Sequence, residues 1–181
     1  MELHLQDRIL ERCKNGDRKA QYELYKQFVK PLYHAVIRLV PSTPEAEDVV
    51  QDAFISIFRN IHQYRSESSL YTWMRRIAVN KALDVLRKKK KIGIINYEEE
   101  AIANLPVIDD HPDQDLINKL HFEIKKLPDG CREILVLYLF EGFKHAEIAG
   151  KLNISESTSK SQYFRAKQLL TQAMIKNKID E

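Results

Sequence analysis

Hydrophobic and polar residues recur with helical spacing over residues 69–91, which contain no Pro or Gly and therefore predict one long helix. One broad side of this helix is apolar. An ordinary surface helix keeps its only Trp on that side, whereas Trp73 lies among cations and amides, as a platform for stacking bases would. A solvated face with a docked Trp is the simpler alternative. The polar side carries Trp73, Arg76, Ile77, Asn80, Lys81, Asp84, Arg87 and Lys88.

The chain before this helix predicts three more. Residues 5–38 contain two helical patterns, separated at Asn15-Gly16-Asp17, and Pro31 predicts a kink or break in the second. Thr43 is placed to cap the next helix, with Pro44 in its first turn. That helix carries a rim of carboxylates beside exposed Ile and Phe, which suits a partner surface; a plain amphipathic helix is the alternative.

A polar loop and a run of cations flank the long helix. Residues 64–70 include three serines, which can cap the helix, and the loop directly precedes the face that bears Trp73. Five consecutive cations close the helix at 87–91. Cations favour a helix C-terminus anyway, but five exceed that need and favour contact with phosphate.

Charge divides the chain into three parts. Residues 1–91 carry 18 Lys and Arg against 11 Asp and Glu; residues 92–118 carry none against 7; and residues 119–181 carry 11 against 8. The 44% hydrophobic content and the five glycines favour a helical globular protein. Two basic parts around an acidic spacer predict two contacts with a polyanion, joined by a linker that avoids it.

The C-terminal part contains a helix-turn-helix pattern. Pro112 begins one helix, Pro128-Asp129-Gly130 turns the chain, and an apolar helix ends at Gly142. Residues 144–170 then predict a short helix, a turn with Asn153 in the left-handed conformation, and a second helix capped by Ser155. A bundle helix with a polar exterior is the alternative, but it leaves Phe164 on the outer side unexplained.

The order of three motifs, DVVQDAFISIF, SSLYTWMRRIAVNKALDVLRK and LPDGCREILVLYLFEGFKHAEIAGKLNISESTSKS, resembles the sigma-70 superfamily, and most closely its compact extracytoplasmic-function (ECF) group. The resemblance covers roughly residues 10–173. It implies an all-α protein with two small helical domains: sigma domain 2 at 5–92, a flexible acidic linker at 93–112, and sigma domain 4 at 113–178. The helix-turn-helix would occupy about 144–163, with a recognition helix that continues to 173.

The resemblance implies three sets of binding residues. Those for core polymerase, on its clamp helices, are Asp48, Gln51, Asp52, Phe54, Ile55 and Phe58. Those that bind and open the −10 element come from the polar loop and from the polar face of the long helix. They are Tyr64, Arg65, Ser66, Ser68, Ser69, Trp73, Arg76, Asn80, Lys81, Asp84, Arg87 and Lys88. Those that read the −35 element are Ser155, Ser157, Thr158, Lys160, Ser161, Phe164, Arg165 and Gln168.

One residue departs from the family pattern. Ser159 occupies an inward position where the family usually has Val or another small aliphatic residue. The loss of packing predicts a cost of about 1 kcal/mol, so we expect Ser159→Val to raise the melting temperature without reducing −35 affinity.

The expected function is that of a sigma factor, which directs promoter-specific transcription initiation and is not an enzyme. Expected partners are core RNA polymerase (clamp helices and flap), duplex and single-stranded promoter DNA, and an anti-sigma factor. No metal or other cofactor is expected, because Cys13 and Cys131 lack ligand spacing and read as reduced thiols. With no signal region or long apolar run, we expect a cytoplasmic protein without membrane insertion.

Two other functions compete. A stand-alone helix-turn-helix regulator explains residues 144–170 but leaves Trp73 and the surface at 48–58 unused. An enzyme acting on nucleic acid would need clustered carboxylates, and Asp48, Asp52 and Asp84 show no convincing ligand spacing.

Overall fold

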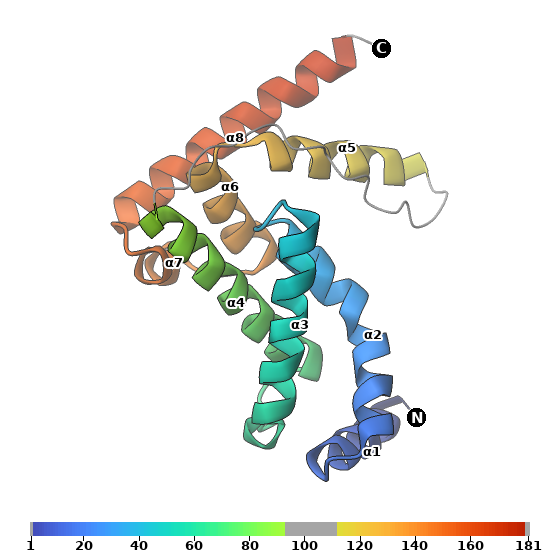
Figure 1. Ribbon diagram of the computed structural model, residues 1–181. Helices are drawn as coiled ribbons and strands as arrows, with labels where there is room; N and C mark the ends of the chain where they lie inside the picture. The colour runs from blue at the N-terminus through green and yellow to red at the C-terminus, as the bar shows by residue number, and fades with distance from the viewer. Residues whose placement is uncertain (1, 93–111, 180–181) are drawn as a thin grey trace. The chain divides into compact units, whose positions relative to one another are not determined.

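The computed structural model describes residues 2–92 and 112–179, and these residues form helices and turns without a β-strand (Figure 1). The chain divides into two units, residues 1–96 and 97–181. The prediction of an all-α protein with two helical domains is confirmed. The predicted linker at 93–112 lies outside the described residues, except for Pro112. None of the described helices is long and apolar enough to cross a membrane.

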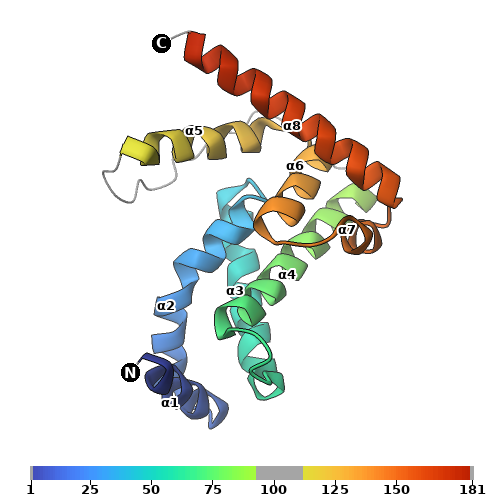
Figure 2. The ribbon, with the colours of Figure 1, turned by 180° about the vertical axis from the view of Figure 1, so that it is seen from behind.

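The first unit is a bundle of four helices with a single turn of 3₁₀ helix. Helix α1 (Glu2–Lys14) packs on α2 (Arg18–Ile37), and α3 (Thr43–Asn60) packs on both α2 and α4 (Leu70–Ile92); η1 (Ile61–Gln63) follows α3. Figure 2 shows these helices from behind. The buried side chains between them, from every helix of the bundle, are apolar. The largest that are fully buried are Leu24, Leu32, Leu39, Ile57, Ile61, Met74 and Leu83.

The helix ends in this unit follow the sequence with one correction, at Thr43. Asp17 caps α2 by accepting hydrogen bonds from the amides of Lys19 and Ala20, at 2.8 and 3.2 Å. Pro31 does not break α2, which runs through it. Thr43 is the first helical residue of α3 rather than its cap, because Ser42 already occupies the cap position in an extended conformation.

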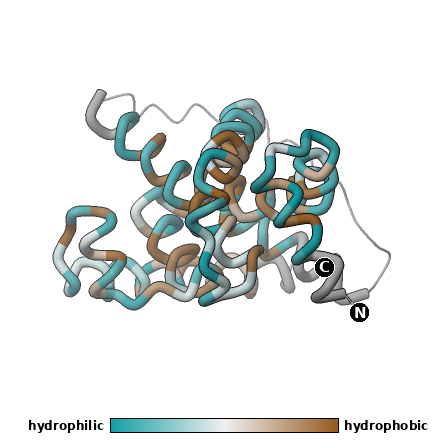
Figure 3. Tube along the Cα trace, turned by 90° about the horizontal axis from the view of Figure 1, so that it is seen from below, coloured by the Kyte–Doolittle hydropathy of each residue, from teal (hydrophilic) through white to brown (hydrophobic). Residues whose placement is uncertain are grey.

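The second unit contains the other helices. Helices α5 (Pro112–Lys126) and α6 (Asp129–Leu135) both pack on α8 (Glu156–Ile179), which also packs on α7 (His145–Leu152). A π-helical turn, η2 (Val136–Phe140), continues α6. Along the helices of both units hydrophobic positions recur between hydrophilic ones, as the colours of Figure 3 show. Helix α8, the predicted recognition helix, extends to Ile179, beyond its predicted end at 173.

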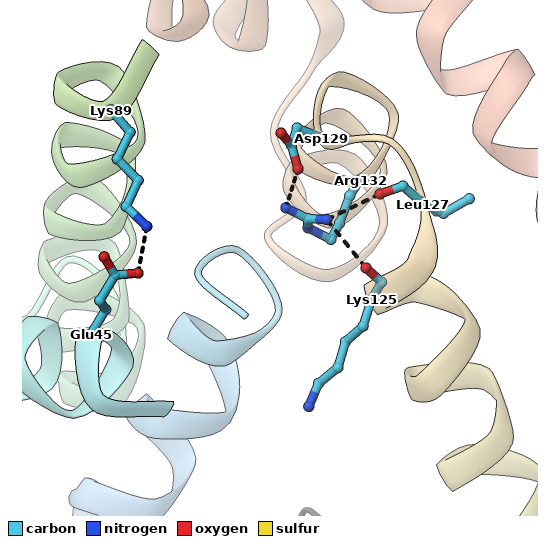
Figure 4. Close-up of polar contacts among 6 residues, drawn as sticks. All are labelled: Glu45, Lys89, Lys125, Leu127, Asp129 and Arg132. Atoms are coloured by element: carbon cyan, nitrogen blue, oxygen red, sulfur yellow. Dashed lines mark hydrogen bonds and ion pairs between the residues drawn. The ribbon is translucent and has the colours of Figure 1, made fainter. Parts of the chain in front are cut away.

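A buried cation fixes the corner between α5 and α6. Asp129 and Gly130, predicted to lie in a turn, are instead the first residues of α6. The Arg132 side chain, 2% exposed overall, donates from Nη1 to the carbonyls of Lys125 and Leu127, at 3.3 and 3.0 Å, and from Nη2 to Asp129 Oδ1 at 2.6 Å (Figure 4). These carbonyls belong to the end of α5, where helical partners run out, so Arg132 caps that helix from the next one.

Candidate nucleic-acid interface

The loop that precedes α4 is held by one aromatic residue. The Tyr64 hydroxyl donates to the Ser68 carbonyl at 2.7 Å, and its ring lies 5.5 Å from the Trp73 ring, tilted by 51°. Ser66 has φ of +58°, a left-handed conformation that a residue with a Cβ adopts only when its surroundings require it. Tyr64 thus braces both ends of the loop and sets its exposed residues beside Trp73.

The N-terminus of α4 agrees with the prediction that a serine caps it. Ser69 Oγ accepts from the amide of Thr72 at 3.1 Å and also exchanges a hydrogen bond of 2.8 Å with the Thr72 hydroxyl. This cap places the first turn of α4 directly after the loop, so the loop and the face with Trp73 form one continuous surface.

The buried and exposed residues of α4 largely match the apolar and polar sides predicted from the sequence, and Trp73 is the exception. Met74, Ala78 and Leu83 are buried, as predicted. Trp73 itself is only half-buried rather than fully exposed, because the Tyr64 ring covers part of it. Among the predicted −10 residues of the helix, Lys81 is half-buried as well, and the exposed ones are Arg76, Asn80, Asp84, Arg87 and Lys88. Ile77, which the pattern placed on the same polar face, is also half-buried.

Ion pairs engage part of the cationic end of α4. Arg87 Nη1 lies 2.9 Å from Asp84 Oδ1, an exposed pair within the helix. Lys89 Nζ lies 2.5 Å from Glu45 Oε2 on the first turn of α3 (Figure 4). Lys89 thus ties the end of α4 to the start of α3, and the contact of this run with phosphate stays a prediction.

The predicted polymerase surface on α3 is partly exposed. Asp48, Gln51 and Asp52 are exposed, and so is the apolar side chain of Ile55, at 49%. Phe58 is half-buried. Phe54 is not on this surface: it is 3% exposed, with its ring 4.8 Å from Tyr25 and 5.9 Å from Phe58. Phe54 supports the surface from the core, as its place on the apolar side of the helix pattern also indicates.

The helix-turn-helix consists of α7, a short turn and α8, as predicted. Asn153 ends α7 with φ of +53° and ψ of +51°, the left-handed conformation expected for it. Ser155 Oγ accepts from the amide of Thr158 at 3.0 Å and so caps α8. The Lys144 amide donates to Glu147 Oε2 at 2.7 Å, which satisfies a backbone group at the start of α7.

Every predicted −35 residue is exposed, Ser155 as the cap of α8 and the others on the helix itself. Phe164 has the most exposed large apolar side chain among the described residues, at 63%. Lys160 Nζ lies 2.6 Å from Glu156 Oε1 one turn earlier, and this hydrogen bond lowers the pKa of Glu156. Glu156 was not predicted as a site residue. The exposed set is Ser155, Ser157, Thr158, Lys160, Ser161, Phe164, Arg165 and Gln168.

The inward face of α8 gives Ser159 a partner that pattern analysis missed. Ser159 is fully buried, which confirms its inward direction, and its Oγ lies 2.9 Å from His145 Nδ1. The His145 ring stacks on Tyr138, with 4.4 Å between centroids, and Tyr163 lies against both rings. The prediction from packing alone did not include this hydrogen bond, which Ser159→Val would remove.

The residues that could hold a metal or react as thiols do not gather. No group of three or more His, Cys, Asp or Glu in the described part of the chain is arranged to bind a metal ion. Cys13 and Cys131 are both buried and unpaired with each other. Burial raises the pKa of the Cys13 thiol to about 11 and also raises that of Cys131, so both are protonated near neutral pH.

Comparison with known families agrees with this geometry. Residues 24–92, which contain the loop and the face of α4, match the family described as Sigma-70 region 2. Residues 117–170, which contain the helix-turn-helix, match the family described as Sigma-70, region 4.

Individual proteins are similar over nearly the whole chain. The ECF RNA polymerase sigma-E factor of Haemophilus influenzae is 31% identical over 182 residues, covering 94% of this chain and 93% of that protein. The ECF RNA polymerase sigma factor SigW of Bacillus subtilis is 29% identical, covering 94% and 96%. Among solved structures, the sigma factor RpoE in complex with the anti-sigma factor NepR from Bartonella quintana has a TM-score of 0.57 at 22% identity, covering 84% of this chain and 95% of that one.

Proposed function

This chain belongs to the sigma-70 superfamily, in its extracytoplasmic-function group, and on that premise we propose how its surfaces act in transcription initiation. It is a sigma factor that joins core RNA polymerase and directs it to promoters. The finer assignment of residues to polymerase, to the −10 element and to the −35 element rests on the exposed surfaces described above.

The first unit would bind polymerase and open the promoter. On α3, the exposed carboxylates of Asp48 and Asp52 beside Ile55 suit a polar rim around an apolar contact, and we assign this surface to the clamp helices. The braced loop and the polar face of α4 are assigned to the −10 element. Opening a duplex requires single-stranded bases to be held, and stacking on an aromatic ring contributes about 1–3 kcal/mol per base.

The second unit would read the −35 element as duplex DNA. A helix fits the major groove, and the first turns of a recognition helix contact base edges while cations contact phosphates. The exposure of Ser157, Lys160 and Arg165 on α8 supports this assignment. The same unit would touch the polymerase flap.

The observation that carries this proposal is the continuous surface formed by the Tyr64–Ser69 loop and α4. A stand-alone regulator that binds duplex DNA through its helix-turn-helix would have no use for a braced loop next to a half-buried Trp. A factor that stabilises separated strands would. The sigma-factor relatives support an initiation factor rather than an enzyme.

An anti-sigma factor is the expected regulator. RpoE of Bartonella quintana, which shares this fold, was solved with the anti-sigma factor NepR bound. A partner that covered the exposed faces of α4 and α8 would block both DNA contacts until it was released. Acting on polymerase and promoter DNA places the protein in the cytoplasm.

Run-off transcription with purified core polymerase tests the proposal. We expect transcripts from a defined start only when this protein is added, on a linear duplex promoter fragment selected by the holoenzyme itself. Duplex binding without polymerase binding and without a transcript would instead identify a stand-alone regulator.

A further inference from the structure

The first ten residues of α8 lack the aliphatic side chains that usually hold a helix in place, and the buried Ala166 comes only after them. From Glu156 to Arg165, α8 contains no Ala, Val, Leu, Ile or Met, and its one large apolar side chain without a polar group, Phe164, points outward. Aliphatic residues on the inner face normally fix a helix against its neighbours by burying apolar surface. Over these ten residues another kind of contact must fix the rotation of α8 about its axis.

Two polar contacts occupy the inner positions instead. Ser159, fully buried, bonds His145 on α7 at 2.9 Å. One turn later, Gln162 Oε1 accepts from the thiol of Cys131 on α6 at 3.0 Å. Burial raises the pKa of Cys131, which keeps the thiol protonated and able to donate. Both contacts join α8 to the two helices on which its N-terminal half rests.

The His145 end of the first contact is itself held. The imidazole stacks on Tyr138 at 4.4 Å, with the rings only 16° from parallel, while Tyr163 of α8 approaches its edge. His145 is also the first residue of α7, whose start is fixed by the bond from the Lys144 amide to Glu147. The ring therefore offers Nδ1 at a defined point rather than as a mobile surface group.

We propose that Ser159 with His145, and Gln162 with Cys131, are positioning residues that fix the rotation of α8 and thereby set the sequence selectivity of −35 recognition. Hydrogen bonds depend on direction as well as distance, whereas apolar packing tolerates sliding. A small rotation of α8 would move every outward side chain across the base edges together. Contacts with phosphate depend less on this rotation, because long cationic side chains adapt.

This inference rests on the assignment of α8 to the −35 element, so its test must separate the two. The full-length protein is mixed with a library of duplexes randomised over about ten base pairs, one helical turn, and the bound fraction is sequenced. The enrichment of the best sequences over the pool measures selectivity. Binding to the unselected pool measures the affinity for duplex DNA that does not depend on its sequence.

The decisive variants are Ser159→Val and Ser159→Thr, whose new side chains have nearly the same shape but differ by a methyl and a hydroxyl. We expect Ser159→Val to lower the enrichment about three- to tenfold, the effect of one lost hydrogen bond, with pool binding unchanged. Ser159→Thr should keep the wild-type enrichment. An equal loss of enrichment in both variants would mean that the volume of the side chain at position 159 matters and not its hydrogen bond. Wild-type enrichment in both variants would also refute the proposal.

A second pair of measurements keeps the test valid if a variant at 159 unfolds. His145→Phe retains an aromatic ring against Tyr138 but removes Nδ1, and it should reduce enrichment as Ser159→Val does. The double variant H145F/S159V should lose no more than either single variant, since both break one bond. Fully additive losses would contradict the pairing. The ¹⁵N spectrum of the His145 ring should change with Ser159→Val and not with Ser159→Thr.

The contact between Gln162 and Cys131 gives an independent test of the positioning role. Gln162→Leu removes the acceptor and should also reduce enrichment, whereas Cys131→Ser keeps a donor and should not. No enrichment by the wild-type protein would contradict the assignment of α8 to the −35 element itself. Clear enrichment by wild type that Ser159→Val, His145→Phe and Gln162→Leu all retain would overturn the positioning role alone.

Discussion

A single arginine stabilises the corner of the second unit. Arg132 is buried, and its charge is compensated by Asp129 and by two carbonyls at the end of α5. We expect Arg132→Met to lower the free energy of unfolding by about 2–4 kcal/mol, because it leaves the carboxylate and the carbonyls in a buried corner without their donor. Urea unfolding followed by circular dichroism measures this. Arg18→Met, at an exposed position on α2, is the control and should change stability by less than about 0.5 kcal/mol.

The buried thiols make a prediction about reactivity. Because burial raises the pKa of Cys13 to about 11, the folded protein should react slowly with a disulfide reagent at pH 8, and Cys131 should behave alike. Reaction should become fast in denaturant. Raising the pH above 9.0, the ordinary value for a thiol, ionises the unfolded state first, so stability should fall between pH 9.0 and about 11. Rapid labelling of the native protein at pH 8 would show that these sites open.

Single residues also mark where sequence patterns stop being informative. A helical period predicted that Ser159 points inward, and it does. It could not predict the bond to His145, because the two residues lie 14 positions apart on helices whose mutual rotation is set by the turn between them. Tyr64 was predicted to contact DNA, while its hydrogen bond to Ser68 was not predicted, because a loop has no period from which the direction of a side chain follows.

At the scale of elements, the turn of the helix-turn-helix depends on one backbone conformation. Asn153 is left-handed, with φ of +53°. Replacing it by Ala should destabilise the second unit by about 1 kcal/mol, since a Cβ without a local hydrogen-bonding group is unfavourable there, whereas Gly should be tolerated. Thermal unfolding of Asn153→Ala and Asn153→Gly gives the comparison. A melting temperature lower for Gly than for Ala would contradict the role assigned to this conformation.

The elements themselves were largely predictable. The long helix expected at 69–91 is observed at Leu70–Ile92, because its strong period and its serine cap agree. The recognition helix continues to Ile179, past its predicted end, because no Gly or Pro stops it there. The π-helical turn at Val136–Phe140 was not predicted, since an apolar run has the same composition in either kind of helix.

At the scale of the molecule, the two DNA contacts should be separable by mutation. Arg165→Ala removes an exposed cation from the recognition face of α8. We expect weaker binding to a −35 duplex, by about 1–3 kcal/mol if Arg165 contacts a base, with binding to core polymerase unchanged. Filter binding and a polymerase pull-down measure the two. Undiminished duplex binding would remove Arg165 from the interface.

The matching prediction for the first unit concerns strand separation. Trp73→Ala should reduce open complexes more than closed complexes, because stacking is available only to bases that have left the duplex. A template already opened at −10 should restore transcription by the variant. On the duplex template, the permanganate reactivity of unpaired thymines should be lower with the variant than with the wild-type protein. Equal loss of closed and open complexes would mean that Trp73 only supports the fold of α4.

The packing of Tyr64 on Trp73 has a practical consequence for spectroscopy. Trp73 is the only tryptophan in the chain, and it lies 5.5 Å from an aromatic donor whose loop is assigned to the −10 element. Its emission is therefore free of interference from other indoles, and a change in that emission on binding DNA reports on this one position. The protein carries its own fluorescent label at the position where strand separation would begin.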